Sequence, residues 1–290
     1  METVDADALL GAHGELLGRL LPGDAPTELT VCEGQFHYVV IGSERVVRLA
    51  RTDAAAARLP SRVAVLRVLS GLDLGVRVPE PLAVAGPDDV VPYVVLTRVP
   101  GAPLVEGTVS GPEVAEVVAR QCHALLSRLF AAGGDQAIRE SIPPAPADRW
   151  RQFADGVRAE LYPLMHASGR TRAERELTAL EALPQLSSAV VHGDLGGANL
   201  LWDNVDGLPA LRGVVDWDDV CLGDPAEDFA AVGAYGPEVL RRVLAHTDGP
   251  TGDLVARIAA IQGTFALQQA LAAYRDGDDE ELADGLTGYR

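Results

Sequence analysis

The spacing of apolar residues changes near residue 100 of this chain of 290 residues. Leucines at helical spacing over 6–21 predict an amphipathic helix. Short apolar runs at 29–32, 38–41 and 45–49 follow, separated by polar connectors, and predict β-strands. The other elements expected here are a helix from Asp53 that Pro60 interrupts before it resumes to about 69, and strands over 82–85 and 92–98.

Beyond Gly101 the helical period dominates. Residues 110–113 resemble a capping box that opens the first helix of this part. The expected elements are helices over 110–132, 150–166 and 171–183, a strand over 189–191, a hairpin of 200–203 with 211–215, and helices to the end. The pattern predicts an α+β fold of two lobes: residues 1–100 with a mostly antiparallel sheet, and residues 101–290, which are mostly helical.

The composition narrows the range of partners. The formal net charge is −18, from 42 acidic and 24 basic residues, and every basic residue is arginine. Such a surface repels phosphate backbones and anionic lipids, so we expect neither nucleic acid nor a membrane as partner. A cationic ligand suits it better, although the same excess also fits a chain that charge merely keeps in solution.

Cysteines and apolar runs exclude other classes. Cys32, Cys122 and Cys221 are odd in number and widely scattered, so they indicate neither a disulfide framework nor a zinc site. The longest apolar runs are far shorter than a membrane span, and the first residues lack the charged segment followed by an apolar core that is typical of a secretory leader. We therefore expect a cytoplasmic protein, either a monomer or a homodimer.

The segment from His192 to Asn199 carries the strongest chemical signal. Asp194 follows an apolar strand in a Gly-rich loop, where a carboxylate can accept the proton of an attacking hydroxyl. Asn199 and Asp216, which ends a second apolar run, supply oxygen ligands of the kind that Mg²⁺ prefers. The spacing H-x-D-x-x-x-x-N is that of the catalytic loop of protein kinases, with Gly193 in place of arginine. This set predicts phosphoryl transfer to a small molecule.

Neighbouring residues admit structural explanations. Asp218 and Asp219 fit metal or cationic-substrate binding and a solvated turn equally well. Asp224, before Pro225, fits a helix cap. We expect Asp228 to hold the backbone amides of the catalytic loop, and the ring of His192 to anchor that loop by bonding to backbone.

These residues together resemble the aminoglycoside phosphotransferase family. The matching segments are 191–199, 215–217, 223–225 and Asp228. The resemblance spans the chain and implies a protein-kinase-like fold, ATP as donor, Mg²⁺ as metal and an alcohol group as acceptor. Within the family, the chain is similar to the enzymes that inactivate cationic cyclic-peptide antibiotics of the tuberactinomycin class, viomycin or capreomycin. The segments that carry this closer likeness are 34–37, 39–43, 190–199, 263–270, 275–278 and 288–290.

The resemblance also implies individual roles. Asp194 would be the catalytic base, with Asn199 and Asp216 as metal ligands. Gly34 and Gln35 would lie in the loop that covers the nucleotide phosphates. The hinge that offers backbone groups to adenine would be formed by Thr97, Arg98 and Val99.

The phosphate-binding residue departs from the family pattern. The usual lysine on the third strand cannot exist here, so Arg48 is the best substitute and Arg51 the second. Arg62 stands where a helix normally supplies a glutamate to orient that lysine. Two arginines repel each other unless a phosphate or another carboxylate lies between them.

We therefore expect a resistance enzyme that phosphorylates a hydroxyl of a tuberactinomycin antibiotic. Asp218, Asp219 and Glu227 are the carboxylates expected to bind this cationic substrate, whereas 278–281 fits a solvated helix start better. The alternatives are a kinase of the same fold for an aminoglycoside, a macrolide, choline or another metabolite alcohol, a catalytically silent pseudokinase, and a metal-dependent hydrolase.

Overall fold

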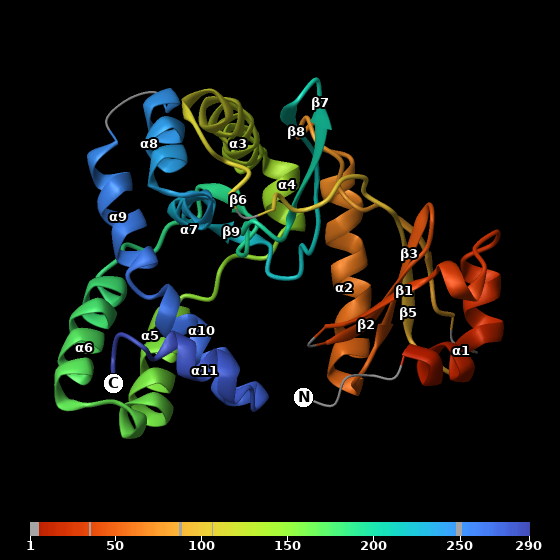
Figure 1. Cartoon of the computed structure of the whole chain (residues 1–290), viewed down its shortest axis with the longest axis horizontal. Coiled ribbons are helices and arrows are strands. Elements are labelled where there is room, and N and C mark those ends of the chain that lie inside the picture. The colour runs from red at the N-terminus through yellow and green to blue at the C-terminus, as the bar shows by residue number, and fades with distance from the viewer. Residues whose placement is uncertain (1–5, 35, 87–88, 106, 248–250) are drawn as a thin grey trace. The chain divides into compact units, whose positions relative to one another are not determined.

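The computed structural model describes residues 6–34, 36–86, 89–105, 107–247 and 251–290. Contacts between residues divide them into two compact units. The N-terminal unit contains the described residues up to 105 together with 198–218. The C-terminal unit contains 107–197 and the described residues from 219 onward. Figure 1 shows the elements of both units, which are described separately below.

The N-terminal unit is built on an antiparallel sheet of strand order β1-β2-β3-β5-β4. Its strands are β1 Thr30–Glu33, β2 His37–Ile41, β3 Arg45–Ala50, β4 Pro81–Val84 and β5 Tyr93–Thr97. They follow the apolar runs of the sequence to within one or two residues at most ends. The predicted sheet is confirmed.

Helix α1, Ala6–Leu20, covers one face of this sheet (Figure 1). Val47 and Leu49 of β3 pack with Leu17 in one buried apolar cluster. Because side chains alternate along a strand, Arg48 between them points to the opposite face. A polar side chain of β3 is therefore directed away from the apolar layer beneath α1.

Helix α2, Asp53–Ser70, runs through Pro60 without interruption, so the predicted break there is wrong. The helix begins after Thr52, whose hydroxyl accepts a hydrogen bond from the Ala55 N–H at 3.1 Å. Leu59, Val63, Leu66 and Leu69 are buried at spacings of three or four residues. Burial of this continuous stripe outweighs the one backbone hydrogen bond that a proline removes.

A hairpin of β7, Leu200–Val205, and β8, Leu208–Val214, was expected from the sequence and is present. Its turn residues, Asp206 and Gly207, have φ of 53° and 84°. Two central residues with positive φ are typical of the tight turn that matches the twist of paired strands.

This hairpin belongs to the N-terminal unit, whereas the sequence assigned it to the lobe 101–290. The reason lies in backbone bonds. The Arg77 N–H donates to the carbonyl of Arg212 at 2.8 Å, and the Val214 N–H donates to the carbonyl of Arg77 at 2.9 Å. Ala102 and Trp202 exchange bonds of 2.9 and 2.8 Å. Such pairings between distant segments leave no signal in the apolar period.

The C-terminal unit is mostly helical. Its helices are α3 Pro112–Ala132, α4 Gln136–Ser141, α5 Arg149–Gly156, α6 Ala167–Glu181, α7 Ala226–Val232, α8 Pro237–His246, α9 Gly252–Gln262, α10 Phe265–Asp276 and α11 Asp279–Gly285. Strand β6, Ala189–Val191, pairs antiparallel with β9, Cys221–Gly223. The strand β9 was not expected, because a run of three residues gives no measurable period.

Two local predictions in this unit are wrong. The single helix expected over 150–166 is α-helical only to Gly156. A π-helical turn, Val157–Leu161, and a 3₁₀ turn follow it. Pro163 lies in that 3₁₀ turn, Tyr162–Leu164, and has no backbone N–H for a further helical hydrogen bond. Helix α3 begins after Gly111 with no side-chain cap, so Ser110 does not cap it.

The fold is α+β, with an antiparallel sheet near the N-terminus and helices in most of the remainder, as the sequence predicted. None of the described helices combines the length and apolar character needed to cross a membrane.

Candidate functional site

The loop after β6 is held by a buried carboxylate. The Asp228 side chain, on α7, accepts hydrogen bonds from the backbone N–H of His192 at 2.8 Å and of Gly193 at 3.1 Å. Burial raises the pKa of Asp228 to about 7, and the two backbone bonds oppose that shift. The prediction that Asp228 holds the backbone amides of the loop that contains Asp194 is confirmed.

His192 fixes the next turn of the loop. It is fully buried, and its Nδ1 accepts a hydrogen bond from the Asp194 N–H at 3.2 Å. The prediction of an anchoring histidine is therefore confirmed. Gly193 has a φ of 89°, and a Cβ there would lie 2.9 Å from the carbonyl oxygen of Asp219. Only glycine fits this position without strain.

Asp194 itself is exposed, between the clamped backbone of Gly193 and the fully buried Leu195. Its main chain is thus fixed on both sides, while its carboxylate faces solvent. Gly197 lies against Tyr235, whose Cε1 would be 3.7 Å from a Cβ at that glycine. A rigid backbone that presents an accessible carboxylate is what a base for an incoming hydroxyl requires.

Asn199 and Asp216 flank the β7–β8 hairpin of the N-terminal unit. Asn199 directly precedes β7, and its carbonyl accepts a hydrogen bond from the Val215 N–H at 3.0 Å. The structure thus brings these two predicted ligand positions to the same end of the hairpin. Asp216 has a φ of 60°, and its side chain is 52 % exposed. Few residues other than glycine adopt this left-handed conformation, and aspartate is among those that tolerate it best.

Arg48 and Arg62 share one carboxylate, that of Asp218. Arg48 donates from Nη1 to Oδ1 at 3.1 Å and from Nη2 to Oδ2 at 2.5 Å, a bidentate pair. Arg62 forms an ion pair with Oδ2 of the same carboxylate. The side chains of both arginines are 17 % exposed and that of Asp218 is 15 % exposed. A carboxylate does lie between the two arginines, so their repulsion is offset.

The electrostatics of Asp218 reflect this position. Burial acts to raise its pKa, but Arg48 and Arg62 outweigh burial and hold the pKa below its ordinary value. Asp216 also lies near Arg48, with its Oδ1 3.7 Å from the same Nη2. The arginine of β3 is therefore in contact with the segment that follows β8, from which both aspartates come.

The remaining carboxylates expected to bind substrate lie in different surroundings. The Glu227 side chain is 8 % exposed and forms an ion pair with Arg149. Burial raises its pKa, against the influence of this arginine. Asp219 is exposed, and its backbone lies against Gly193, which precedes Asp194. Of these two residues, only Asp219 presents its carboxylate to solvent.

The residues expected to contact the nucleotide are spread over the N-terminal unit. Gly34 donates its N–H to the carbonyl of His37 at 2.9 Å, and its own carbonyl accepts from Arg51 Nη1 at 2.7 Å. Gln35 lies outside the described residues. Arg51 also pairs with Glu33 at 2.5 Å, which commits it to this loop. Arg48, and not Arg51, is thus the arginine of the β3 region that reaches Asp218 and Asp216.

The predicted hinge follows β5 directly. Thr97 is the last residue of that strand, and its hydroxyl accepts from the Glu80 N–H at 2.9 Å. Arg98 donates from Nη1 to the Gly42 carbonyl at 3.0 Å, while Val99 is buried. The three residues form one continuous segment whose side chains are engaged within the unit.

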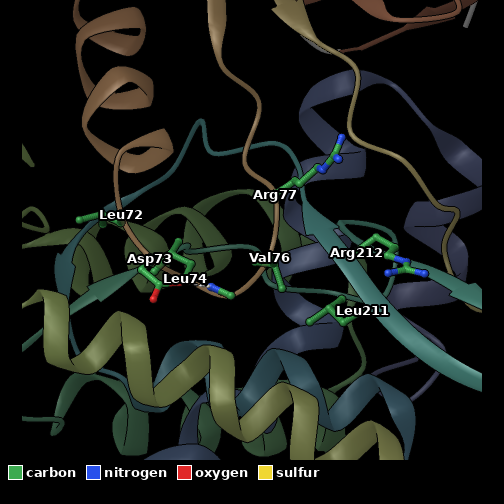
Figure 2. Close-up of a pocket in the computed structure, with 8 residues that line it drawn as sticks. Leu72, Asp73, Leu74, Val76, Arg77, Leu211 and Arg212 are labelled. Atoms are coloured by element: carbon green, nitrogen blue, oxygen red, sulfur yellow. Dashed lines mark hydrogen bonds between the residues drawn. The ribbon is translucent and has the colours of Figure 1, made fainter.

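A cavity of about 350 Å³ in the N-terminal unit is lined by residues 72–77, Leu211 and Arg212. Figure 2 shows it beside the loop that follows α2, with Arg77 and Arg212 extending in different directions. None of the predicted site residues lines this cavity. In the part of the chain that the structure describes, no group of three or more histidine, cysteine or acidic side chains could hold a metal ion.

Comparison with known proteins identifies the family. The model of the phosphotransferase enzyme family matches residues 35–261. The chain belongs to this family. Viomycin phosphotransferase of Streptomyces vinaceus is 61% identical over 285 residues, which cover 97% of this chain and 99% of that protein. This phosphotransferase is thus aligned with that relative over nearly its whole length.

Solved structures share the fold of this phosphotransferase. The GDP and kanamycin complex of APH(2")-IIia has a TM-score of 0.81 at 20% identity, covering 95% of this chain and 96% of that one. Macrolide 2'-phosphotransferase MphH from Brachybacterium faecium has a TM-score of 0.68 at 21% identity, covering 98% of each chain. The expected protein-kinase-like fold is confirmed.

Proposed function

We propose that this phosphotransferase transfers the γ-phosphate of ATP to a hydroxyl of a tuberactinomycin antibiotic, viomycin or capreomycin, and so confers resistance. The observation that carries the proposal is the 61% identity to viomycin phosphotransferase, which extends over 97% of the chain. The net charge of −18 supports it, because an acidic surface attracts a strongly cationic substrate.

Asp194 is the catalytic base in this proposal. Its carboxylate orients the antibiotic hydroxyl and takes the proton as the hydroxyl oxygen bonds to the γ-phosphorus and ADP leaves. The clamp made by Asp228 and His192 keeps the backbone of this loop in one conformation. The loop therefore requires no rearrangement before it accepts the proton.

Asn199 and Asp216 hold Mg²⁺ in this proposal. One amide oxygen and one carboxylate, partly exposed and at the same end of a hairpin, fit an ion that takes its other ligands from phosphate and water. The ion, when bound, neutralises charge on the nucleotide phosphates. Gly34, Gln35 and Arg48 bind those phosphates. In the segment of Thr97, Arg98 and Val99, the N–H groups of the first two residues already donate to carbonyls of the protein, so Val99 offers its backbone N–H to the adenine ring.

The carboxylates expected to bind the antibiotic divide into two groups. Asp219 keeps that role, because its side chain is exposed. Asp218 instead holds Arg48, since both its oxygens already contact guanidinium groups. Glu227 stabilises the packing of Arg149 in the C-terminal unit, because a buried, paired carboxylate offers no free edge to a ligand.

A coupled assay of ADP release tests the proposal with ATP, Mg²⁺ and a panel of viomycin, capreomycin, kanamycin, a macrolide and choline. Viomycin or capreomycin should give the highest kcat/KM. A higher value for kanamycin or the macrolide would assign another substrate to the same chemistry. ATP binding without ADP release with any acceptor would indicate a pseudokinase, and release of inorganic phosphate without an acceptor would indicate a hydrolase.

A further inference from the structure

His37, in the N-terminal unit, is a buried polar side chain with one ring nitrogen that bonds to nothing in the described residues. It begins β2, directly after the loop that contains Gly34, and is 2 % exposed. Its Nδ1 lies 3.2 Å from Nη2 of Arg48. Its Nε2 is buried and has no hydrogen-bond partner among the described residues. A buried polar atom without a partner is unusual in a folded protein and needs an explanation.

The contact with Arg48 decides which ring nitrogen carries the proton. A guanidinium group can only donate, so Nδ1 of His37 must accept. The ring is neutral, because burial and the charges of Arg48 and Arg62 lower its pKa to about 4, with Asp218 acting in the opposite direction. The proton therefore sits on Nε2, which makes this atom a donor without an acceptor.

The surroundings of this donor match a ligand with acceptor atoms. The guanidinium groups of Arg48 and Arg62 share the carboxylate of Asp218, and the carboxylate of Asp216 also lies near Arg48, so the formal charges of these four side chains balance. The Nε of Arg48 is a second buried donor without a hydrogen-bond partner among the described residues. Two buried, unmatched donors beside these arginines fit a ligand with several acceptor oxygens, which describes a phosphate group.

Strand register confirms that these side chains share one face. Val39 pairs with Arg48 across β2 and β3, and His37 lies two residues before Val39 on the same side of the sheet. This is the face opposite the cluster beneath α1, and it adjoins the loop expected to cover the nucleotide phosphates. A phosphate bound by Arg48 would therefore also lie near His37.

We propose that His37 is a nucleotide-binding residue whose Nε2–H donates a hydrogen bond to a phosphate oxygen of the nucleotide that Arg48 binds. The inference rests on the proposed function, because it takes ATP as the ligand. Since Nε2 is buried before the ligand arrives, nucleotide binding displaces part of its cover. His37 then adds a donor beside those of Arg48, and its Nδ1 accepts from Nη2 of Arg48.

Two substitutions separate the ring nitrogens. The amide oxygen of His37→Asn reaches the position of Nδ1 and can still accept from Arg48, but no group reaches Nε2. The longer side chain of His37→Gln carries its amide nitrogen to the position of Nε2. Isothermal titration of each full-length variant with ATP, ADP and adenosine, in the presence of Mg²⁺, measures what is lost.

We expect His37→Asn to bind ATP and ADP about tenfold more weakly and adenosine as well as the wild type does. His37→Gln should retain most of the affinity for ATP. Equal weakening for adenosine and ATP would indicate a packing role and overturn the inference. So would a His37→Asn variant that binds ATP like the wild type.

Nitrogen-15 spectra of histidine-labelled wild-type protein provide a test that no variant can spoil by misfolding. The free protein should show the Nε2–H tautomer of His37 from pH 6 to 8, and the Nε2 resonance should shift when ADP and Mg²⁺ are added. An unchanged resonance at saturating ADP would overturn the inference alone if the wild type still phosphorylates viomycin. Absence of nucleotide binding by the wild type would overturn the inference and the proposed function together.

Discussion

Two regions of this phosphotransferase hold a charged side chain by different means. Asp194 in the C-terminal unit is positioned through its backbone: its own N–H donates to the His192 ring, and the N–H groups of His192 and Gly193 donate to Asp228. Arg48 in the N-terminal unit is positioned through its side chain, by the bidentate pair with Asp218. The first arrangement depends on residues close in sequence plus one buried carboxylate. The second joins residues 170 positions apart.

These two arrangements differ in how far a sequence motif can reveal them. A backbone clamp needs a fixed order of residues along the loop, so it appears as a motif that can be read directly. A side-chain ion pair needs only that two groups meet in space, so either partner can change element during evolution. In this chain the partner of the β3 cation comes from the segment after β8 and not from helix α2.

Among the variants proposed here, removal of the Asp194 side chain should reduce activity most. Asp194→Ala removes the proposed base, so the kcat for viomycin phosphorylation should fall by more than about a hundredfold. ATP affinity and the unfolding midpoint should change little, because the Asp194 carboxylate is exposed and the loop is clamped through its backbone. Asp194→Asn is the matched control for charge alone. A kcat within a few-fold of wild type in the alanine variant would refute the role.

A second set of variants removes the carboxylate between Arg48 and Arg62 and then restores one from α2. Asp218→Asn leaves Arg48 and Arg62 without the carboxylate between them, so kcat/KM for ATP should fall about tenfold or more. Adding Arg62→Glu returns a carboxylate from α2, the usual source in kinases, and should recover most of the loss. Adding Arg62→Gln instead removes the repulsion but supplies no partner, so recovery should be smaller. Equal rates for the two double variants would contradict this explanation.

A smaller effect is expected in the pH dependence of the free energy of unfolding, which the Asp228 carboxyl contributes to. Burial raises the pKa of Asp228 from 3.8 to about 7, against the backbone bonds from His192 and Gly193. The folded chain then binds this proton more tightly than the unfolded chain does. The stabilisation is complete below about pH 4 and is lost as the pH rises through about 7.

Urea unfolding of the wild type and Asp228→Asn from pH 4 to 8 measures this effect, because the asparagine cannot titrate. The free energy of unfolding of the wild type, relative to that of the variant, should decrease between these limits. A difference that stays constant with pH would contradict the assigned pKa shift.

The sequence predicted the β1–β5 sheet, the hairpin and the loop from His192 to Asp194, because apolar period, turn residues and motif spacing are local properties. Pro60 inside α2 was mispredicted, since the gain from burying Leu59 and Val63 arises only from tertiary packing. The role of Asp218 could not be read from its neighbours Trp217 and Asp219. Its partners Arg48 and Arg62 become visible only when β3, α2 and the end of β8 meet.

The importance of His37 could have been inferred from the pairing of β2 with β3. Taken alone, it reads as one of several histidines without metal spacing. The register of β2 and β3, in which Val39 pairs with Arg48, puts it on the face of the arginine that we propose binds phosphate. A correct prediction of strand pairing would therefore have singled it out from sequence, whereas a correct prediction of strand positions could not.

Mass spectrometry of viomycin after incubation with the enzyme, ATP and Mg²⁺ tests the central claim most directly. We predict an increase equal to one phosphate, located by fragmentation on a single hydroxyl and absent with Asp194→Ala. Unmodified viomycin and capreomycin, from a protein that binds ATP, would contradict the account.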